Sequence, residues 1–336
     1  MTLYLGADEV NALVTPELAI TAVRSAVAAE RAGETTLPAR LDLDLPSGFM
    51  RLMPAALSEV MGAKLMTVVR GVGNRYLLLL FSRQTGELEA ILEASELTRM
   101  RTAAVTVVAG EMLCPQGAGR LGLIGSGFEA EGHLVAFAAA WELDEVLVYS
   151  PSRERRTAFA QRMSAELGLR VTAVDSAAAA AGEAPVAVLA TKSSEPVIGG
   201  GEFCAAGTVL SIGSTRPDLR ELDAACFARS AVLLCDRVEQ VRSESGDVID
   251  AVTAGAIETE RIVGMGEYDG GGRREDGRDL FVFKSVGTAL QDLALAEAVL
   301  DAARRDGYGR DLGELAMLKP SSAPRGPGLS TAGTGA

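Results

Sequence analysis

RLGLIGSGFEAEGH, residues 120–133, is the stretch that sets the fold of this chain. Its apolar start is followed by Gly125, Gly127 and Ala130 in a G-x-G-x-x-A spacing. Gly125 permits a tight strand-to-helix reversal, Gly127 lets backbone N–H groups approach a pyrophosphate, and Ala130 lets the helix pack closely on the strand. A pyrophosphate there would lie at the positive end of the helix dipole. The stretch therefore predicts a dinucleotide-binding turn, and its expected cofactor-binding residues are Gly125, Ser126, Gly127, Phe128, Glu129 and Ala130.

Strands that alternate with helices follow this turn. The apolar runs expected as strands are residues 145–149, 170–174, 186–190, 208–213 and 231–235, with helices at 152–167 and 176–182. Such alternation is typical of βαβ units. The chain is therefore predicted to be an α/β protein with a doubly wound parallel sheet of the Rossmann type.

The residues before the turn have a different pattern. After a short apolar piece at 3–5, the expected elements are a helix that follows the N-cap Thr15 to about Arg31, extended segments at 37–55, 63–69, 76–81 and 88–92, and a helix over 93–114. Within them LDLDL, residues 41–45, alternates apolar and acidic residues as a half-buried strand does. This part is predicted to be an α+β unit with an antiparallel sheet.

The chain beyond Asp236 is predicted to be rich in loops. Residues 269–274 are expected to be exposed and flexible, 280–283 to form a strand and 289–304 a helix. The tail from Lys319 is rich in Pro, Gly, Ser and Thr and has little apolar surface to bury, so it is expected to be disordered.

Composition and charge exclude several classes of function. The net charge of −13 makes a nucleic-acid backbone or an anionic membrane an unsuitable partner. The four cysteines form no C-x-x-C pair, and no leader or bilayer-spanning apolar run is expected, so the predicted location is the cytoplasm. The single histidine, His133, lies in the helix after the glycine turn and is interpreted as structural. No catalytic triad and no metal site are expected, and the chemistry falls to Lys, Arg, carboxylates, hydroxyls and a cofactor.

The end of the second predicted Rossmann strand indicates which nucleotide binds. It lies about twenty residues past the glycine turn and offers Ser150, Ser152 and Arg153, with no acid at the strand end. Hydroxyls with a guanidinium suit a 2′-phosphate, which favours NADP(H) and leaves NAD(H) possible. The alternative is that Ser152 is only a helix N-cap and that the arginines lie on a solvated helix face.

Four cations stand in or beside apolar stretches: Arg40, Arg51, Lys64 and Arg101. Each alone is more typical of a surface charge. Together they could form a carboxylate clamp, because guanidinium groups match carboxylate geometry.

Several separated motifs now combine over most of residues 1–315. They are LMP at 52–54, GAK at 62–64, LTRMRTAA at 97–104, the glycine turn with His133-Leu134, the Thr191 segment with Pro196-Val197, RPDLRELD at 216–223, ESGD at 244–247 and FKSVGTALQD at 283–292. In this order they resemble the ornithine cyclodeaminase/μ-crystallin family.

The resemblance implies a homodimer with a cleft between a substrate domain and a Rossmann domain. The corresponding boundaries are 1–115 plus 286–318 for the substrate-binding and dimerisation domain, 116–285 for the Rossmann domain and 319–336 for the tail. By similarity Arg40, Lys64 and Arg101 would hold the substrate carboxylate, and Lys64 would act as acid or hydrogen-bond donor beside the reacting C=N or C=O group. Thr102, Thr191 and Ser285 would line the cofactor.

Two departures from the family pattern bear on activity. Cyclodeaminases carry an aspartate in a G-x-D-x-P segment, where this chain has Thr215 within Gly213–Pro217. A hydroxyl cannot serve as that base near neutral pH, and the segment resembles the ketimine reductase branch. The loop between Lys64 and Tyr76 is shorter than the family's usual loop, so the substrate side chain cannot be carried over.

The leading hypothesis is an NAD(P)H-dependent oxidoreductase that reduces the C=N bond of an imino acid, or oxidises the corresponding amino acid, by hydride transfer. The partner is then a small imino, oxo or amino acid, and the proton comes from Lys64 or an ordered water. The alternatives are an NAD-dependent cyclodeaminase of the ornithine or lysine type and a non-catalytic NADPH-dependent ligand-binding protein.

Overall fold

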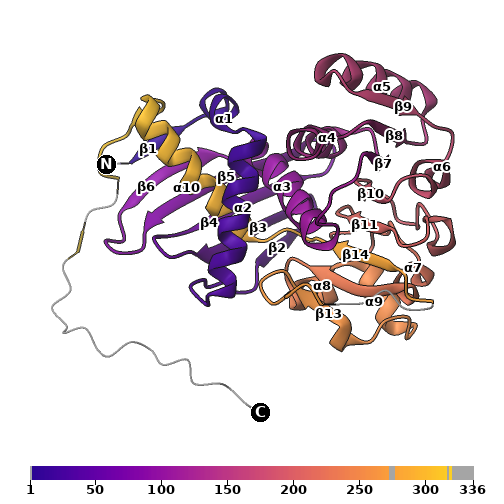
Figure 1. Ribbon diagram of the computed structural model, residues 1–336. Coiled ribbons are helices and arrows are strands. Elements are labelled where there is room, and N and C mark those ends of the chain that lie inside the picture. Colours follow the sequence, from indigo (N-terminus) through magenta and orange to yellow (C-terminus); the bar gives the residue numbers. More distant parts are fainter. Residues whose placement is uncertain (1, 272–276, 316–317, 320–336) are drawn as a thin grey trace, which may run out of the picture.

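The chain forms two β-sheets, as the computed structural model shows (Figure 1). The structure describes residues 2–271, 277–315 and 318–319. One sheet has seven strands in the order β15-β1-β6-β5-β4-β3-β2, and the other has eight in the order β13-β12-β14-β11-β10-β7-β8-β9. Residues 320–336 of the expected disordered tail and 272–274 of the expected flexible segment lie outside the described residues.

The elements follow one another along the chain with these bounds. The strands are β1 Leu3–Leu5, β2 Leu41–Leu45, β3 Gly48–Ala56, β4 Val60–Val69, β5 Gly73–Ser82, β6 Leu88–Glu93, β7 Arg120–Ile124, β8 Glu145–Tyr149, β9 Arg170–Ala173, β10 Val186–Leu189, β11 Thr208–Ser211, β12 Ser230–Cys235, β13 Ile262–Gly264, β14 Leu280–Lys284 and β15 Arg310–Asp311. The helices are α1 Ala7–Leu13, α2 Pro16–Arg31, α3 Ser95–Leu113, α4 Phe128–Ala140, α5 Arg153–Leu167, α6 Ala177–Gly182, α7 Ala224–Ala228, α8 Val238–Glu244, α9 Gly246–Thr253 and α10 Ala289–Asp306, with 3₁₀ turns at Gly200–Glu202 and Thr259–Arg261.

The eight-stranded sheet is parallel throughout, as the alternating pattern predicts. Its strands β10, β11 and most of β7 are buried along their length, because helices cover both faces. From β7 the chain runs outward through β8 and β9 and then returns to β10 on the other side of β7. This reversal is the topological switch point of a doubly wound fold, at which ligands bind. The predicted fold class is confirmed.

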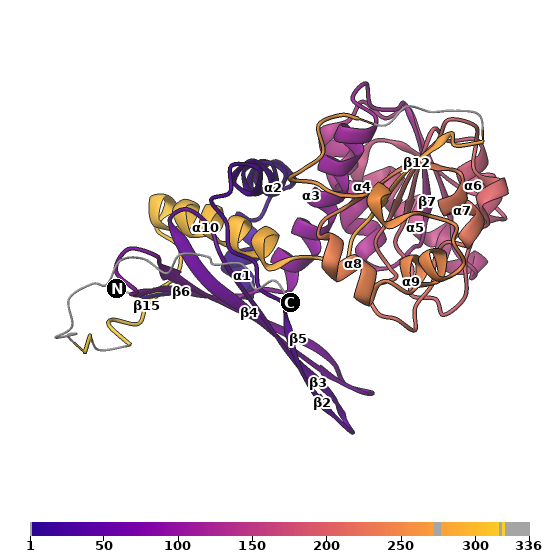
Figure 2. The same cartoon turned by 90° about the horizontal axis from the view of Figure 1, so that it is seen from below.

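The seven-stranded sheet pairs antiparallel from β2 to β6, and β1 joins β6 in parallel. In Figure 2 the helices α2 and α10 lie on one face of this sheet, while β2, β3 and β5 extend beyond the body of the molecule. The expected extended segment at 37–55 is two strands, β2 and β3, joined by a tight turn. The connection between β4 and β5 is also tight, with Val69 paired to Gly73.

Two sequence expectations are wrong. All five residues of β2 are exposed rather than half-buried, because β2 is an edge strand of the projecting hairpin. The segment beyond Asp236 holds helices α8 and α9 and the edge strand β13, where loops were expected. These helices are seven and eight residues long, too short for the helical period of apolar residues to stand out.

Helix α3 lies between the two sheets and packs against α4 of the parallel one. His133 of α4 is fully buried at this contact, with Nε2 3.0 Å from Thr106 Oγ1 and Nδ1 2.7 Å from the Glu129 carbonyl oxygen. Burial lowers the pKa of His133 to about 4, so the ring is neutral near pH 7. His133 therefore belongs to the packing of α3 on α4.

No single helix among the described residues is long and apolar enough to span a membrane. Helices α1 and α2 together reach the required length and hydropathy, but they are bent by 83° at the break between them.

Candidate active site

The glycine turn lies at the switch point between β7 and β10. Gly125 has φ +131°, and a Cβ atom there would lie 2.5 Å from the Ala190 carbonyl oxygen, so no other residue fits without a shift. A Cβ at Gly127 would meet nothing within 4 Å, and Gly127 is the N-cap of α4, where no side chain caps the helix. The first N–H groups of α4 are therefore available to an anion, and the turn fits a dinucleotide pyrophosphate.

The end of β8 has the serines that were expected there and also an acid. Ser126 Oγ donates to Ser150 Oγ at 2.8 Å, which ties the glycine turn to this strand end. Ser152 caps α5 by accepting from Arg155 N at 3.2 Å, and its hydroxyl donates to Glu154 Oε2 at 2.9 Å. The sequence interpretation overlooked Glu154 because it lies five residues past the strand, in the first turn of α5.

The arginines at this edge differ in their surroundings. Arg153 is exposed, and its guanidinium makes no hydrogen bond or ion pair with other described residues. Arg156 is buried, donates to the Ser150 carbonyl oxygen at 3.0 Å and binds Asp175 at 2.6 Å. Arg153 is thus available to a ligand, whereas Arg156 holds the strand end in place.

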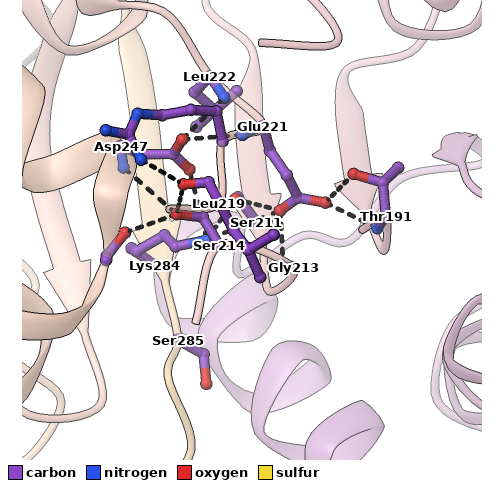
Figure 3. A network of polar contacts seen from close by, with 12 residues as sticks. Thr191, Ser211, Gly213, Ser214, Leu219, Glu221, Leu222, Asp247, Lys284 and Ser285 are labelled. Carbon is purple, nitrogen blue, oxygen red and sulfur yellow. Dashed lines mark hydrogen bonds and ion pairs between the residues drawn. The ribbon is translucent and has the colours of Figure 1, made fainter. Parts of the chain in front are cut away.

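Glu221 joins the loops at the carboxyl edge of the parallel sheet (Figure 3). Its carboxylate is fully buried and accepts four hydrogen bonds. The donors are Thr191 N at 2.7 Å, Thr191 Oγ1 at 2.7 Å, Ser211 Oγ at 2.6 Å and Gly213 N at 2.7 Å. Because the Thr191 hydroxyl proton is committed to Glu221, that oxygen can offer only lone pairs to a ligand.

Lys284 supplies positive charge to this network. Its buried Nζ donates to Ser211 Oγ at 2.8 Å and lies 3.6 Å from Glu221 Oε2 and 3.5 Å from Asp247 Oδ2. Asp247 in turn accepts from Glu221 N at 2.8 Å. Two buried carboxylates share one ammonium group here, which fixes the loops after β10, β11 and β14 relative to one another.

Asp236 fixes the connection from β14 to α10. Its Oδ2 accepts from Ser285 Oγ at 2.7 Å and from Gly287 N at 2.7 Å. Gly287 has φ +78°, and a Cβ there would lie 2.5 Å from Arg101 Nη1. Gly287 therefore lets the chain pass against the Arg101 guanidinium as it crosses from one sheet to the other.

Lys64, Arg101 and Asp292 form a buried ion cluster. Lys64 Nζ lies 2.7 Å from Asp292 Oδ2, and Arg101 Nε donates to Asp292 Oδ1 at 2.8 Å. Arg101 Nη1 also donates to Gln291 Oε1 at 3.0 Å. The three charged residues come from β4, α3 and α10, and their exposed fractions are 2%, 6% and 0%.

Burial changes the proton affinity of the cluster. The pKa of Lys64 is lowered to about 8, mainly by burial, against the opposing charge of Asp292 and with a smaller contribution in the same direction from the charge of Arg101. Lys64 is therefore charged at neutral pH but can lose its proton in weakly alkaline solution. The Tyr76 ring covers the ammonium group, with its centroid 5.9 Å from Nζ.

The other two expected cations occupy separate positions. Arg40 Nε donates to Glu244 Oε1 at 2.7 Å, and Nη1 donates to the carbonyl oxygens of Val286 and Gly287 at 3.3 and 3.5 Å. Arg40 therefore contacts the same β14–α10 connection that passes Arg101. Arg51 forms a bidentate pair with Asp42 across the projecting hairpin and is not part of the cluster.

The glycine turn and the ion cluster are neighbours. Arg99 of α3 lies over the ring of Phe128, the first residue of α4, at 4.7 Å. The charges of Arg101 and Lys64 both lower the pKa of Glu129, the next residue. Thr102 follows Arg101 on α3 and donates to the Thr98 carbonyl oxygen at 2.7 Å.

Two surface hollows include none of the residues of the glycine turn or the ion cluster. One is lined by residues 33–36 with Ser58 and Arg83, and the other by residues of α2 with Val108, Glu111 and Met112.

Sequence reasoning did not assign the carboxylates that organise the site: Glu221, Asp236, Glu244, Asp247 and Asp292. Asp292 carries a signal that could have been found, because it is the only charged residue in the apolar run from Val286 to Ala296. An acid in such a run must be buried with a partner. The described residues contain no group of three or more His, Cys, Asp or Glu side chains able to hold a metal ion.

A parallel sheet with a dinucleotide turn at its switch point, set beside a buried cation cluster on a second sheet, defines a nicotinamide-dependent α/β enzyme. The chain belongs to the ornithine cyclodeaminase/mu-crystallin family, whose model matches residues 2–307. The resemblance seen in the motifs is thereby confirmed.

Two relatives in sequence and one solved structure illustrate which proteins the chain is similar to. The ketimine reductase mu-crystallin of Mus musculus is 32% identical over 263 residues, 76% of this chain and 80% of that protein. A Delta(1)-pyrroline-2-carboxylate reductase of Bacillus cereus is 30% identical over 321 residues, 91% and 98% of the two chains. The structure of Thermococcus litoralis Delta(1)-pyrroline-2-carboxylate reductase with NADH and L-proline matches with a TM-score of 0.86 at 29% identity, and covers 92% of this chain and 100% of that one.

Replacing Asp292 by Asn should lower the pKa of Lys64 below its wild-type value of about 8, because the negative charge that stabilises the ammonium form is lost. The sequence has four lysines, so NMR of ¹³C-labelled lysine can follow Lys64, with Lys64→Met to assign its signal. The variant should also lose about 3–5 kcal/mol of unfolding free energy, since two buried cations lose their partner. A wild-type Lys64 that titrates near 10.5 would contradict the cluster.

Proposed function

We propose that this protein is an NAD(P)H-dependent oxidoreductase that reduces the C=N bond of a small imino acid, or oxidises the corresponding amino acid. The observation that carries the proposal is the buried Lys64–Asp292–Arg101 cluster beside the dinucleotide turn. Named imine reductases among the relatives support it. The division into a substrate domain, residues 1–115 with 286–318, and a Rossmann domain, residues 116–285, belongs to the same proposal.

The cations are proposed to hold the substrate carboxylate. Lys64 and Arg101 are paired with one carboxylate only, so together with Asp292 they carry a net charge of +1 in a buried place. Arg40, which contacts the adjacent β14–α10 connection, adds a third cation, and the carboxylate of Glu244 balances its charge. A carboxylate ligand complements this charge and can accept the guanidinium and ammonium protons that Asp292 and Gln291 leave free.

Lys64 is also proposed to act on the reacting group. Its ammonium group is buried, has a pKa of about 8 and can donate a hydrogen bond or a proton near neutral pH. The nicotinamide ring, when bound, supplies the hydride. Thr102, Thr191 and Ser285 are proposed to line the cofactor, with Thr191 and Ser285 restricted to accepting hydrogen bonds because their protons go to Glu221 and Asp236.

We propose NADP(H) as the preferred cofactor, because Ser150 and the unengaged Arg153 offer donors to a 2′-phosphate, and Ser152 adds a third when its hydroxyl turns away from Glu154. NAD(H) is the second candidate, since Glu154 places a carboxylate 2.9 Å from Ser152 Oγ, where a ribose hydroxyl could donate to it.

A homodimer is proposed from the projecting hairpin. Leu41, Leu43 and Leu45 of β2 are 61%, 54% and 50% exposed on an edge strand, and such a row of apolar groups is suited to a partner surface. The proposed location is the cytoplasm, supported by the buried thiols of Cys226 and Cys235.

Substituting Lys64 by Met or Arg101 by Ala should lower kcat/KM for Δ1-pyrroline-2-carboxylate by at least about 100-fold, because the carboxylate and the proton lose their donors. NADPH and NADH oxidation is followed by absorbance over a panel of cyclic imines and 2-oxo acids with amines. Cofactor binding by fluorescence is the control and should stay unchanged. Full turnover by either variant would contradict the assignment. Ammonia release from L-ornithine or L-lysine with oxidised cofactor and no net change in the cofactor would instead indicate a cyclodeaminase. Tight binding of the panel without turnover would indicate a ligand-binding protein.

Substituting Arg153 by Ala should raise KM for NADPH about tenfold and leave that for NADH nearly unchanged, because only the phosphate needs the guanidinium. Glu154→Gln should act in the opposite sense by removing a like charge. Steady-state kinetics with both cofactors measure the ratio. An unchanged NADPH-to-NADH ratio in Arg153→Ala would favour NADH.

Placing a charge on β2 with Leu43→Asp should convert the dimer to a monomer, because the carboxylate would be buried without a partner in the interface. Light scattering coupled to gel filtration measures the mass. Leu315→Asp, at an exposed leucine outside the hairpin, is the matched control. A wild-type chain that elutes as a monomer would contradict the proposal.

A further inference from the structure

The carboxylates around the ion cluster differ in whether their oxygens accept hydrogen bonds or form ion pairs with other protein groups. Asp292 gives one oxygen to Lys64 and the other to Arg101. Asp236 accepts hydrogen bonds from the Ser285 hydroxyl and from backbone amides, and Glu244 is paired with Arg40. Glu129 is the exception, because its Oε2 is buried and has neither a hydrogen bond nor an ion pair among the described residues.

Glu129 lies between the two proposed halves of the site. It is the second residue of α4, directly after the glycine turn, and the charges of Lys64 of β4 and of Arg99 and Arg101 of α3 lower its pKa. Both Arg99 and Arg101 make their hydrogen bonds elsewhere, to Glu96 and to Asp292 with Gln291. Glu129 is thus near enough to these cations for their charges to lower its pKa, while its buried Oε2 makes no direct contact with any of them.

A buried carboxylate oxygen without a donor is costly, and native structures rarely leave one so unless an ordered water, an ion or a ligand supplies the partner. A substrate carboxylate has no proton to give, and neither does a pyrophosphate. The hydroxyl and carboxamide groups of a nicotinamide cofactor do carry protons, and a contact with them would make a Glu129 variant lose affinity for the cofactor. The protonated nitrogen of an imino or amino acid does carry an N–H group. In such a substrate this nitrogen is one bond from the carbon that bears the carboxylate, so it lies near the carboxylate clamp.

We propose that Glu129 binds the protonated nitrogen of the substrate, and so makes the site select C=N over C=O substrates. The inference rests on the proposed function, because it takes the Lys64 and Arg101 clamp as the carboxylate site. Glu129 then accepts the N–H hydrogen bond and stabilises the positive charge, while Lys64 and Arg101 hold the carboxylate. A 2-oxo acid presents an oxygen lone pair to the same carboxylate and is repelled.

The charge of Glu129 depends on its surroundings. Burial raises the pKa of its carboxyl group, Arg101, Arg99 and Lys64 lower it, and Glu96 raises it. Tyr76 of β5 faces the same charges. Selection for nitrogen should therefore weaken as the pH falls and Glu129 takes up a proton.

The experiment compares Glu129→Gln, which keeps the shape of the side chain but not its charge, with the wild-type protein. The ligands are L-proline and cyclopentanecarboxylate, which share ring size and carboxylate but differ in the nitrogen. Calorimetry in the presence of oxidised cofactor should show that the wild-type chain prefers L-proline at least tenfold and that Glu129→Gln loses this preference. The ratio of kcat/KM for Δ1-pyrroline-2-carboxylate to that for pyruvate should fall at least tenfold in the variant and lose its decline at low pH.

Glu131→Gln is the matched control, because Glu131 is on the same helix but pairs with Arg162 at 2.7 Å. It should leave both preferences unchanged. Retained preference for L-proline in Glu129→Gln would overturn the proposal, as would an equal loss of affinity for cofactor and both ligands, which would place Glu129 on the cofactor. A wild-type chain that discriminates the ligands but never oxidises cofactor would contradict the proposed reaction and leave Glu129 as the nitrogen contact. Binding of neither ligand would contradict both.

Discussion

The double pairing of Asp292 with Lys64 and Arg101 is the constraint on which the site depends. Three charges are almost wholly buried, which proteins tolerate only when each ion has a close partner. The carboxylate comes from α10, and the cations come from β4 and α3, so the pair distances of 2.7 and 2.8 Å hold three separate elements together. The surplus positive charge that remains is what suits the cluster to a carboxylate ligand.

The same cluster depends on the parallel sheet through one short connection. β14 is the last strand added to that sheet, yet it leads directly to α10 and Asp292. Asp236 holds this connection by accepting from Ser285 and Gly287, and the Lys284 network holds the strand end just before it. Because Gly287 lies against Arg101, a displacement of the connection would displace the guanidinium. The cofactor edge and the cation cluster are therefore positioned together.

Much of this arrangement follows from local patterns. The glycine spacing and the alternation of strands with helices predicted the parallel sheet, and the motif order predicted the family, which the match over residues 2–307 confirms. Short helices α8 and α9 escaped prediction because too few residues repeat, and β2 was misjudged because an alternating strand at a projecting edge has no core to face. Lys64 and Arg101 were singled out because charges in apolar runs need partners, but the sequence did not identify those partners.

The sequence by itself determined most of the longer elements, the dinucleotide turn and the types of side chain available for chemistry, because these depend on neighbours within a few residues. Only the tertiary structure decided which charges meet. Asp292 lies 228 positions from Lys64 in the sequence (292 − 64) and contacts it because α10 returns to the first sheet. Tertiary packing also buried Glu129 Oε2 without a hydrogen-bond donor, whereas it gave the Glu221 carboxylate four hydrogen bonds. A charge in an apolar run indicates that it needs a partner, but which residues meet is a property of the packed chain that no local pattern encodes.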